Sequence, residues 1–244
     1  MKHFLSRIKN TLRSFLGCHE FKCVCCGRDV FDGVAVCPEC MKKLEFIEGN
    51  ACRKCGKPTG ENEFCGRCGK RELLFDRAWS ALVYHGALRK AMLAYKFGGY
   101  KYISGVFAKF LADKAVKENI PFGAVTYVPL TQKDQRKRGY NQTRLLAEKF
   151  CDILKLPPPE VLLVKTKQTE KQEKLDYKQR ALNLKGAFAS IDKDKIKGRQ
   201  ILIIDDVLTT GATAGECAKT LKKAGADKVF VLTVATRKET IKLD

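Results

Sequence analysis

Two adjacent carboxylates followed by a hydroxyl-rich loop carry the clearest chemistry in this sequence. Asp205 and Asp206 follow four branched apolar residues, 201–204, whose lack of alternation indicates a strand buried on both faces. We predict that the strand stops at the carboxylates, and the amphipathic run 214–224 indicates a helix shortly afterwards. Strand, loop and helix in this order are typical of a ligand site at the carboxyl end of an open sheet.

The loop between this strand and this helix consists of Thr209, Thr210, Gly211, Ala212 and Thr213. Its glycine lets backbone N–H groups turn inward and its threonines offer hydroxyls. At a helix N-terminus such a loop predicts a phosphate site. Because the two carboxylates repel phosphate, they must face neutral hydroxyls or a hydrated metal ion, and a ribose 5-phosphate satisfies both requirements. An acidic strand end capped by threonine, or a receiver-like pair that binds Mg²⁺, are the alternatives.

Eight of the twelve cysteines form four C-x₂-C pairs, which is the spacing of zinc ligands. The eight are Cys23, Cys26, Cys37, Cys40, Cys52, Cys55, Cys65 and Cys68. Since two pairs complete a tetrahedral Cys₄ site, we predict two structural zinc ions, held either by successive pairs or in an interleaved cross-brace. Gly27, Gly56 and Gly69 each follow a pair and suit the tight turns that such ligands require.

A basic segment follows a second predicted strand at 125–130 and precedes a predicted helix at 145–154. It contains Arg136, Arg138 and Tyr140, and we interpret it as a loop. Guanidinium groups grip phosphates in a bidentate manner, so the segment predicts a pyrophosphate site. The same cations around an aromatic ring are also suited to clamping single-stranded nucleic acid, or they form a solvated charged surface.

The bulk composition is that of a folded protein with polyanionic partners. The 244 residues are 45% hydrophobic and 30% charged, and the formal net charge is +20. This charge favours nucleic acid first and an acidic membrane second as partners, and it says nothing about fold. No apolar run has the length of a signal-peptide core or a transmembrane segment, so we expect a cytoplasmic location. We predict a basic amphipathic helix at 1–20, a double zinc ribbon at 21–72 and an α/β domain at 76–244.

Residues 201–213, Ile-Leu-Ile-Ile-Asp-Asp-Val-Leu-Thr-Thr-Gly-Ala-Thr, closely resemble the motif with which type I phosphoribosyltransferases bind 5-phosphoribosyl 1-pyrophosphate (PRPP). The resemblance implies a parallel sheet flanked by helices and a ligand bound together with Mg²⁺. It also implies that Asp205 and Asp206 are the catalytic pair on the ribose hydroxyls and that residues 209–213 hold the 5-phosphate. The polar segment 165–186 stands where these enzymes carry a loop that closes over the ligand.

Further motifs extend the resemblance from Cys23 to about Arg237. Besides the cysteine pairs they are Tyr-x-Gly-x-Leu-Arg at 84–89, Val-Pro-Leu at 128–130, Arg-x-Arg-Gly-Tyr-Asn-Gln at 136–142, Gln-x₂-Leu at 172–175 and Arg-x₂-Asn-x₂-Gly-Ala-Phe at 180–188. Together they resemble the ComF family of competence and DNA-uptake proteins. Lys165 and Lys167 depart from the family, in which arginines are common at these positions. The resemblance implies a cytoplasmic role in DNA processing beside a helicase-like partner, and it establishes no reaction.

Three functional interpretations follow. In the first, the protein transfers a phosphoribosyl group from PRPP, with Arg136 and Arg138 on the departing pyrophosphate. In the second, it binds single-stranded DNA through the zinc ribbons and residues 133–144, and the PRPP-type pocket is regulatory. A purely structural adaptor is the third, and it leaves the phosphate loop unexplained. The sequence leaves turnover and the acceptor open.

Overall fold

The computed structural model describes residues 22–30, 35–71, 73–169 and 177–238. The chain divides into two compact units, Met1–Lys43 and Leu44–Asp244. The first unit contains the short helix α2 (Pro38–Met41), for which Cys37 is the N-cap. The predicted helix at 1–20 lies outside the described residues, as do Gln172 and Leu175 of the predicted closing loop.

A four-stranded parallel sheet forms the centre of the second unit. In spatial order its strands are β1 (Arg77–Val83), β6 (Lys228–Thr236), β5 (Gln200–Leu208) and β2 (Ala124–Tyr127). Each neighbouring pair runs parallel. Residues 201–204 of β5 are wholly buried because the strand has a partner on each side and a covering layer on each face. The prediction of a doubly buried strand from this unbroken apolar run is therefore confirmed.

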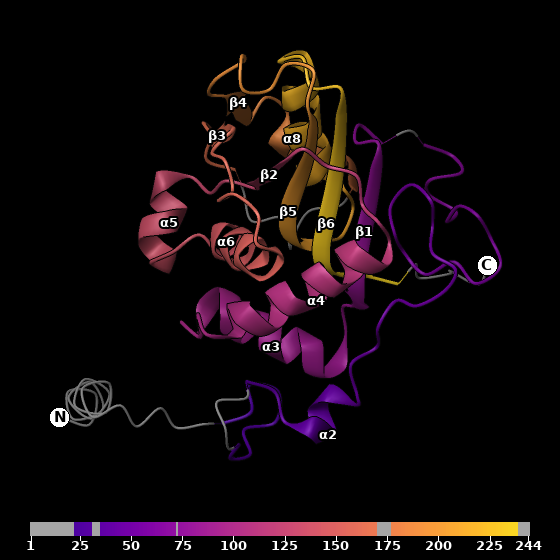
Figure 1. Cartoon of the computed structure of the whole chain (residues 1–244), viewed down its shortest axis with the longest axis vertical. Coiled ribbons are helices and arrows are strands. Elements are labelled where there is room, and N and C mark those ends of the chain that lie inside the picture. The colour runs from indigo at the N-terminus through magenta and orange to yellow at the C-terminus, as the bar shows by residue number, and fades with distance from the viewer. Residues whose placement is uncertain (1–21, 31–34, 72, 170–176, 239–244) are drawn as a thin grey trace. The chain divides into compact units, whose positions relative to one another are not determined.

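Helices cover both faces of the sheet (Figure 1). On one face lie α4 (Ile103–Lys117) and α6 (Gln142–Leu154), with α3 (Gly86–Phe97) against α4. On the other face α8 (Ala212–Lys223) packs Cys217 and Leu221 into one core cluster with Ile201 and Ile203 of β5. Since side chains alternate along a strand, Leu202 and Ile204 face the α4 and α6 layer.

A smaller layer lies beside α8. It consists of the antiparallel pair β3 (Leu163–Lys165) and β4 (Phe188–Ser190), together with helix α7 (Tyr177–Leu184). Both β4 and α7 contact α8. The polar segment 165–186 is therefore helical over part of its length, and its two ends are fixed by the β3–β4 pair.

Two local predictions were wrong. The strand does not stop at the carboxylates, because β6 continues to pair with β5 through Asp205↔Thr233 as far as Leu208↔Thr236. The basic segment is not a loop, because it forms helix α5 (Gln132–Arg138). The Thr131 hydroxyl caps this helix by accepting the Asp134 N–H at 3.2 Å, and Gly139 ends it in the left-handed conformation with φ 83°.

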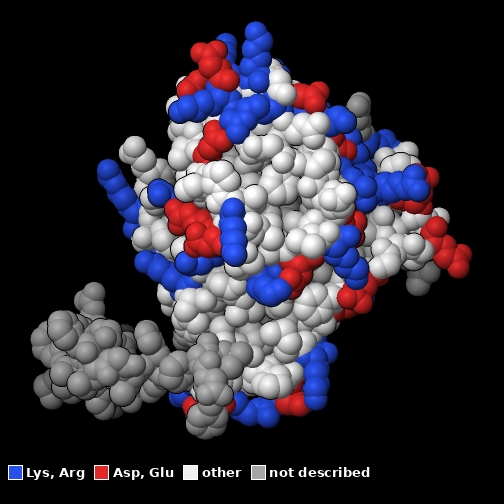
Figure 2. Space-filling model, viewed as in Figure 1, with Lys and Arg blue, Asp and Glu red and all other residues white. Residues whose placement is uncertain are grey.

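The predicted fold class is confirmed, since the α/β sheet is parallel and flanked by helices, and a cysteine-rich region precedes it. In the part of the chain that the structure describes, no helix has the length and apolar character needed to cross a membrane. Lys and Arg side chains occur around the face shown in Figure 2, with Asp and Glu side chains among them. The net charge is therefore not gathered into a single patch on that face.

Candidate functional site

The acidic pair lies within β5, near the carboxyl end of the parallel sheet. Asp205 and Asp206 are both buried, at 9% and 4% exposed. Successive residues of a strand point to opposite faces, so the two carboxylates meet different layers of the protein. Asp205 accepts the backbone N–H of Asp206 at 2.8 Å through its own Oδ1, which holds its carboxylate against the strand.

Asp206 is bound by one cation and one amide from two helices. The Lys96 ammonium of α3 lies 2.8 Å from Asp206 Oδ1. The Gln142 side-chain amide at the start of α6 donates to Asp206 Oδ2 at 3.0 Å. Each carboxylate oxygen of Asp206 therefore has its own donor, and the two helices are tied to the centre of the sheet.

A network of hydrogen bonds fixes Gln142 in turn. Arg138, at the end of α5, donates to Gln142 Oε1. The Tyr95 hydroxyl donates to the Gln142 carbonyl at 2.6 Å, and the Tyr140 hydroxyl donates to the Tyr95 carbonyl. Asn141, the N-cap of α6, accepts the N–H groups of Thr143 and Arg144. The basic segment is thus connected to the acidic pair through Gln142.

The electrostatics of the site are dominated by burial. Burial, followed by the neighbouring charge of Asp206, raises the pKa of Asp205 to about 7. For Lys96, burial acts to lower the pKa, but the charge of Asp206 and the hydrogen bond to it outweigh this effect and raise the pKa. Because Lys96 already pairs with Asp206, the net charge of the site near neutral pH depends on the protonation of Asp205, whose ionised form suits a cation and whose oxygens suit the hydroxyls of a sugar.

The predicted phosphate loop connects β5 to α8. Gly211 is the N-cap of α8 with φ 80°, which is a left-handed conformation that favours glycine. The Thr210 hydroxyl accepts the Ala212 N–H at 3.3 Å. The first N–H groups of a helix have no partner within the helix, so the start of a helix favours an anion. The residues at the start of α8 and directly before it are Thr209, Thr210, Gly211, Ala212 and Thr213. Their assignment to PRPP stays a prediction.

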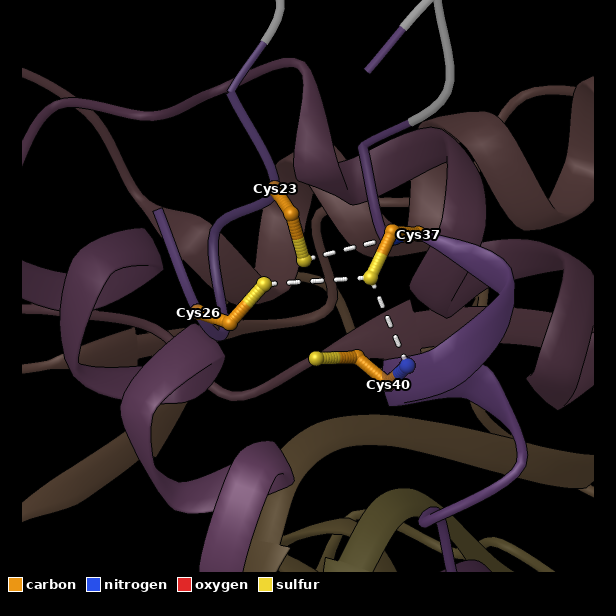
Figure 3. Close-up of side chains that lie close together, drawn as sticks. All are labelled: Cys23, Cys26, Cys37 and Cys40. Carbon is orange, nitrogen blue, oxygen red and sulfur yellow. Dashed lines mark hydrogen bonds between the residues drawn. The ribbon is translucent and has the colours of Figure 1, made fainter. Parts of the chain in front are cut away.

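The four N-terminal thiols of the first cysteine cluster face one another (Figure 3). The ligand sulfurs of Cys23, Cys26, Cys37 and Cys40 all lie within 4.8 Å of one another. Cys26 Sγ and Cys37 Sγ are 3.8 Å apart. Four sulfurs at about 2.3 Å from a tetrahedral zinc ion stand about 3.8 Å from one another, so this geometry fits a structural zinc site.

Backbone N–H groups also point at these sulfurs. The Cys37 N–H donates to Cys23 Sγ at 3.3 Å, and the Cys40 N–H donates to Cys37 Sγ at 3.4 Å (Figure 3). Such donors stabilise thiolates and orient them as ligands. The second of these bonds arises because Cys37 is the N-cap of α2, so that its sulfur accepts an N–H from the first turn of the helix.

The second cluster has the same spacing in a different setting. The sulfurs of Cys52, Cys55, Cys65 and Cys68 lie within 4.8 Å of one another, and Cys55 Sγ is 3.6 Å from Cys65 Sγ. Successive pairs therefore share a site in both clusters, which decides against the cross-brace. This cluster belongs to the unit that contains the sheet, and three of its cysteines lie in the main hydrophobic core. The domain boundaries drawn at residues 72 and 76 stay predictions.

Lys96 and Gln142 were not among the predicted site residues. Both stand in motifs that the sequence displays, Lys-Phe-x-Gly at 96–99 and Arg-x-Arg-Gly-Tyr-Asn-Gln at 136–142, but neither motif reveals that α3 and α6 meet at Asp206. Of the two predicted pyrophosphate ligands, Arg138 reaches this network. Arg136 is exposed, and no contact among the described residues joins it to the acidic pair.

The fold and the two clusters together define a protein in which cysteine-rich ribbons precede a parallel α/β domain. A family model for the double zinc ribbon domain matches residues 20–69. Competence protein F of Haemophilus influenzae is 28% identical over 80% of this chain and 94% of its own length. ComFC of Bacillus subtilis is 27% identical over 86% and 92%, and the DNA utilization protein YhgH of Escherichia coli is 28% identical over 80% and 88%. The predicted resemblance to the ComF family is therefore confirmed over most of the chain.

Solved structures also match, at low similarity. One is glutamine PRPP amidotransferase from B. subtilis, with a TM-score of 0.40 and 18% identity over 58% of this chain and 30% of that chain. Another is a hypoxanthine phosphoribosyltransferase from Staphylococcus aureus, with a TM-score of 0.34 and 13% identity over 58% and 69%. At these scores the matches carry no argument about ligand or activity.

Proposed function

We propose that this protein binds PRPP with Mg²⁺ at the carboxyl end of its parallel sheet and acts in the handling of DNA during natural competence. The observation that carries the first part is the juxtaposition, within one strand and the following loop, of a buried acidic pair and a helix N-terminus. Asp205 and Asp206 meet the ribose hydroxyls, and residues 209–213 receive the 5-phosphate.

The surrounding cations suit the pyrophosphate end of the ligand. Lys96 already lies on Asp206, and Arg138 reaches the same group through Gln142. Bound Mg²⁺ would supply neutralisation of the pyrophosphate charge, and the ionised form of Asp205 suits its presence. The names of the relatives, competence protein F and ComFC, support the second part of the proposal. A cytoplasmic location and a helicase-like partner belong to the same proposal.

Calorimetric titration of the zinc-loaded protein with PRPP, with and without Mg²⁺, tests the pocket. Binding is expected to require Mg²⁺ and to be lost in the Asp205→Asn/Asp206→Asn double variant. Asp113→Asn on α4 is the control, because Asp113 is exposed and pairs with Lys109. Equal affinity in the double variant would remove the acidic pair from the site. Pyrophosphate release upon addition of a nucleobase would then separate an enzyme from a binding protein.

A second candidate function rests on a separate surface observation. Phe97, Tyr100 and Tyr102 are 64%, 44% and 49% exposed. Arg138 lies over the Phe97 ring at 5.2 Å from its centroid, and Lys101 lies over the Tyr140 ring at 5.2 Å. Exposed rings interleaved with cations are the usual platform for single-stranded nucleic acid, so we propose that this aromatic and basic surface binds single-stranded DNA.

Salt-dependent binding of an oligothymidylate tests this surface. Phe97→Ala is expected to weaken binding about tenfold through lost stacking, without changing the slope of log affinity against log salt. Arg138→Gln is expected to lower that slope by about 0.7, the share of one phosphate on a single strand. Lys149→Gln, which removes an exposed pair with Asp152 and lies outside residues 133–144, is the control. Unchanged affinity in Phe97→Ala would contradict the proposal.

A further inference from the structure

The second cysteine cluster lies directly beside the phosphate loop. One pocket is lined on one side by Cys55, Cys65 and Cys68 of the cluster, and on the other by Thr209, Thr210 and Gly211 of the loop. Two cations of the ribbon, Lys57 and Arg67, line the same pocket. The sequence separates these two groups by more than a hundred residues, so this arrangement exists only in the folded unit.

The ribbon is held firmly in this position. Ala78 at the start of β1 donates its N–H to the Lys54 carbonyl at 2.9 Å. A Cβ on Gly56 would stand 2.7 Å from the Ala78 carbonyl oxygen, so the turn after the first ligand pair of this cluster touches the strand backbone. Beneath the loop, a Cβ on Gly211 would stand 3.4 Å from the Phe75 ring. The residues that join ribbon to sheet are thus packed under the phosphate loop.

Lys57 is the unexplained group in this pocket. The residue as a whole is 5% exposed and lines the pocket, although its ammonium is not among the fully buried side-chain atoms, and within the described part of the chain no carboxylate pairs with it. A cation that is largely enclosed and has no carboxylate beside it favours an anion as its neighbour. The pocket offers two: the thiolates of the zinc cluster, and an anion bound by the N–H groups of the loop.

We propose that Lys57 of the second zinc ribbon is a further phosphate-binding residue, which acts together with loop 209–213 on the 5-phosphate of the ligand. The inference rests on the proposed PRPP site and deepens it by adding a side chain from outside the α/β domain. It makes the ribbon part of the ligand site. The class of ligand is a phosphomonoester, and ribose 5-phosphate is the probe because it lacks the pyrophosphate that other cations would hold.

The test is calorimetric titration of the zinc-loaded full chain with ribose 5-phosphate. Lys57→Gln is expected to weaken binding about tenfold, which is the effect of losing one charge-assisted hydrogen bond. The matched control is Lys70→Gln, which makes the same charge change at an exposed position of the same ribbon and is expected to leave affinity within about twofold. Lys57→Arg keeps the charge and is expected to retain most of the affinity.

The zinc content of Lys57→Gln distinguishes the two possible counter-charges of the Lys57 ammonium, the zinc cluster and the bound phosphate. If Lys57→Gln holds two zinc ions per chain and binds weakly, the ammonium serves the phosphate. If it binds as tightly as the unaltered protein, or if it loses zinc, the ammonium serves the cluster and the inference is overturned. Failure of the unaltered protein to bind either PRPP or ribose 5-phosphate overturns the proposed function itself, whereas binding that depends on Asp205 and Asp206 but not on Lys57 overturns only this inference.

Discussion

Lys96 Nζ lies 2.8 Å from Asp206 Oδ1, and the two side chains are 22% and 6% exposed. This ion pair joins the end of α3 to the central strand β5, and Gln142 of α6 binds the other oxygen of the same carboxylate. It places a cation against one member of the acidic pair. In the proposed function, we assign the same ammonium to the pyrophosphate of the bound ligand.

Removal of the Lys96 ammonium leaves Asp206 buried with a single amide donor. We expect Lys96→Met to lower the free energy of unfolding by about 3 kcal/mol, because a buried charge that loses its partner is costly. The control is Lys109→Met, which removes an exposed pair with Asp113 and is expected to cost less than about 0.5 kcal/mol. Urea denaturation at pH 7 measures both, and equal losses would show that the Lys96 pair is solvated.

Asp205 predicts a specific dependence of stability on pH. Its pKa is raised from 3.8 to about 7, so the folded protein binds its proton more tightly than the unfolded chain does. The stabilisation is complete below pH 4 and is lost as the pH rises to 7. Asp205→Asn has no such loss, so its Tm relative to the unaltered protein is expected to increase between pH 4 and 7 and then to level off. A difference that falls over this range, measured by scanning fluorimetry, would contradict the raised pKa.

The turns after the first ligand pair of each cluster provide a matched comparison. Gly27 and Gly56 occupy the same place in the two ribbons, with φ 76° and 70°. Gly27→Ala meets no atom within 4 Å and is expected to cost about 1 kcal/mol of left-handed strain. Gly56→Ala is expected to cost clearly more, because its Cβ would stand 2.7 Å and 2.9 Å from the backbone of Ala78 and Trp79. Zinc retention during urea titration measures both, and a smaller effect of Gly56→Ala would refute the close packing of ribbon on strand.

The two zinc clusters are expected to differ in what they stabilise. Cys55 is 4% exposed and belongs to the main core, whereas Cys40 lies in the other compact unit. Trp79 on β1 is the single tryptophan, so its fluorescence reports on the sheet. We expect Cys55→Ser to lower the midpoint of its thermal transition by about 5–10 °C, and Cys40→Ser to change it little. Each variant is expected to hold one zinc ion fewer. Equal shifts of the two thermal midpoints would contradict the expectation that only the second cluster stabilises the sheet.

Sequence patterns correctly predicted those features that depend only on residues close together in the chain. An apolar run without alternation predicts a doubly buried strand wherever it lies, and C-x₂-C spacing brings two thiolates to one metal by turn geometry alone. The loop 209–213 could be predicted as a phosphate site because a glycine and hydroxyl groups directly before an amphipathic run are typical of few other kinds of site. The prediction of a loop at residues 132–138 was wrong although the helix has local signals, since Thr131 is its N-cap and Gly139 ends it in the left-handed conformation.

The sequence by itself determined the strand–loop–helix that carries the acidic pair, the four C-x₂-C pairs and the resemblance to the ComF family. Only the tertiary structure decided that Lys96 and Gln142 meet at Asp206 and that successive cysteine pairs share each site. It also decided that the second ribbon, with Lys57, lies against the phosphate loop. The physical reason is that these contacts join residues far apart in the chain. The packing of the helices on the sheet, and the surfaces that this packing removes from water, determine which of these residues meet. The spacing of residues along the sequence does not contain that information.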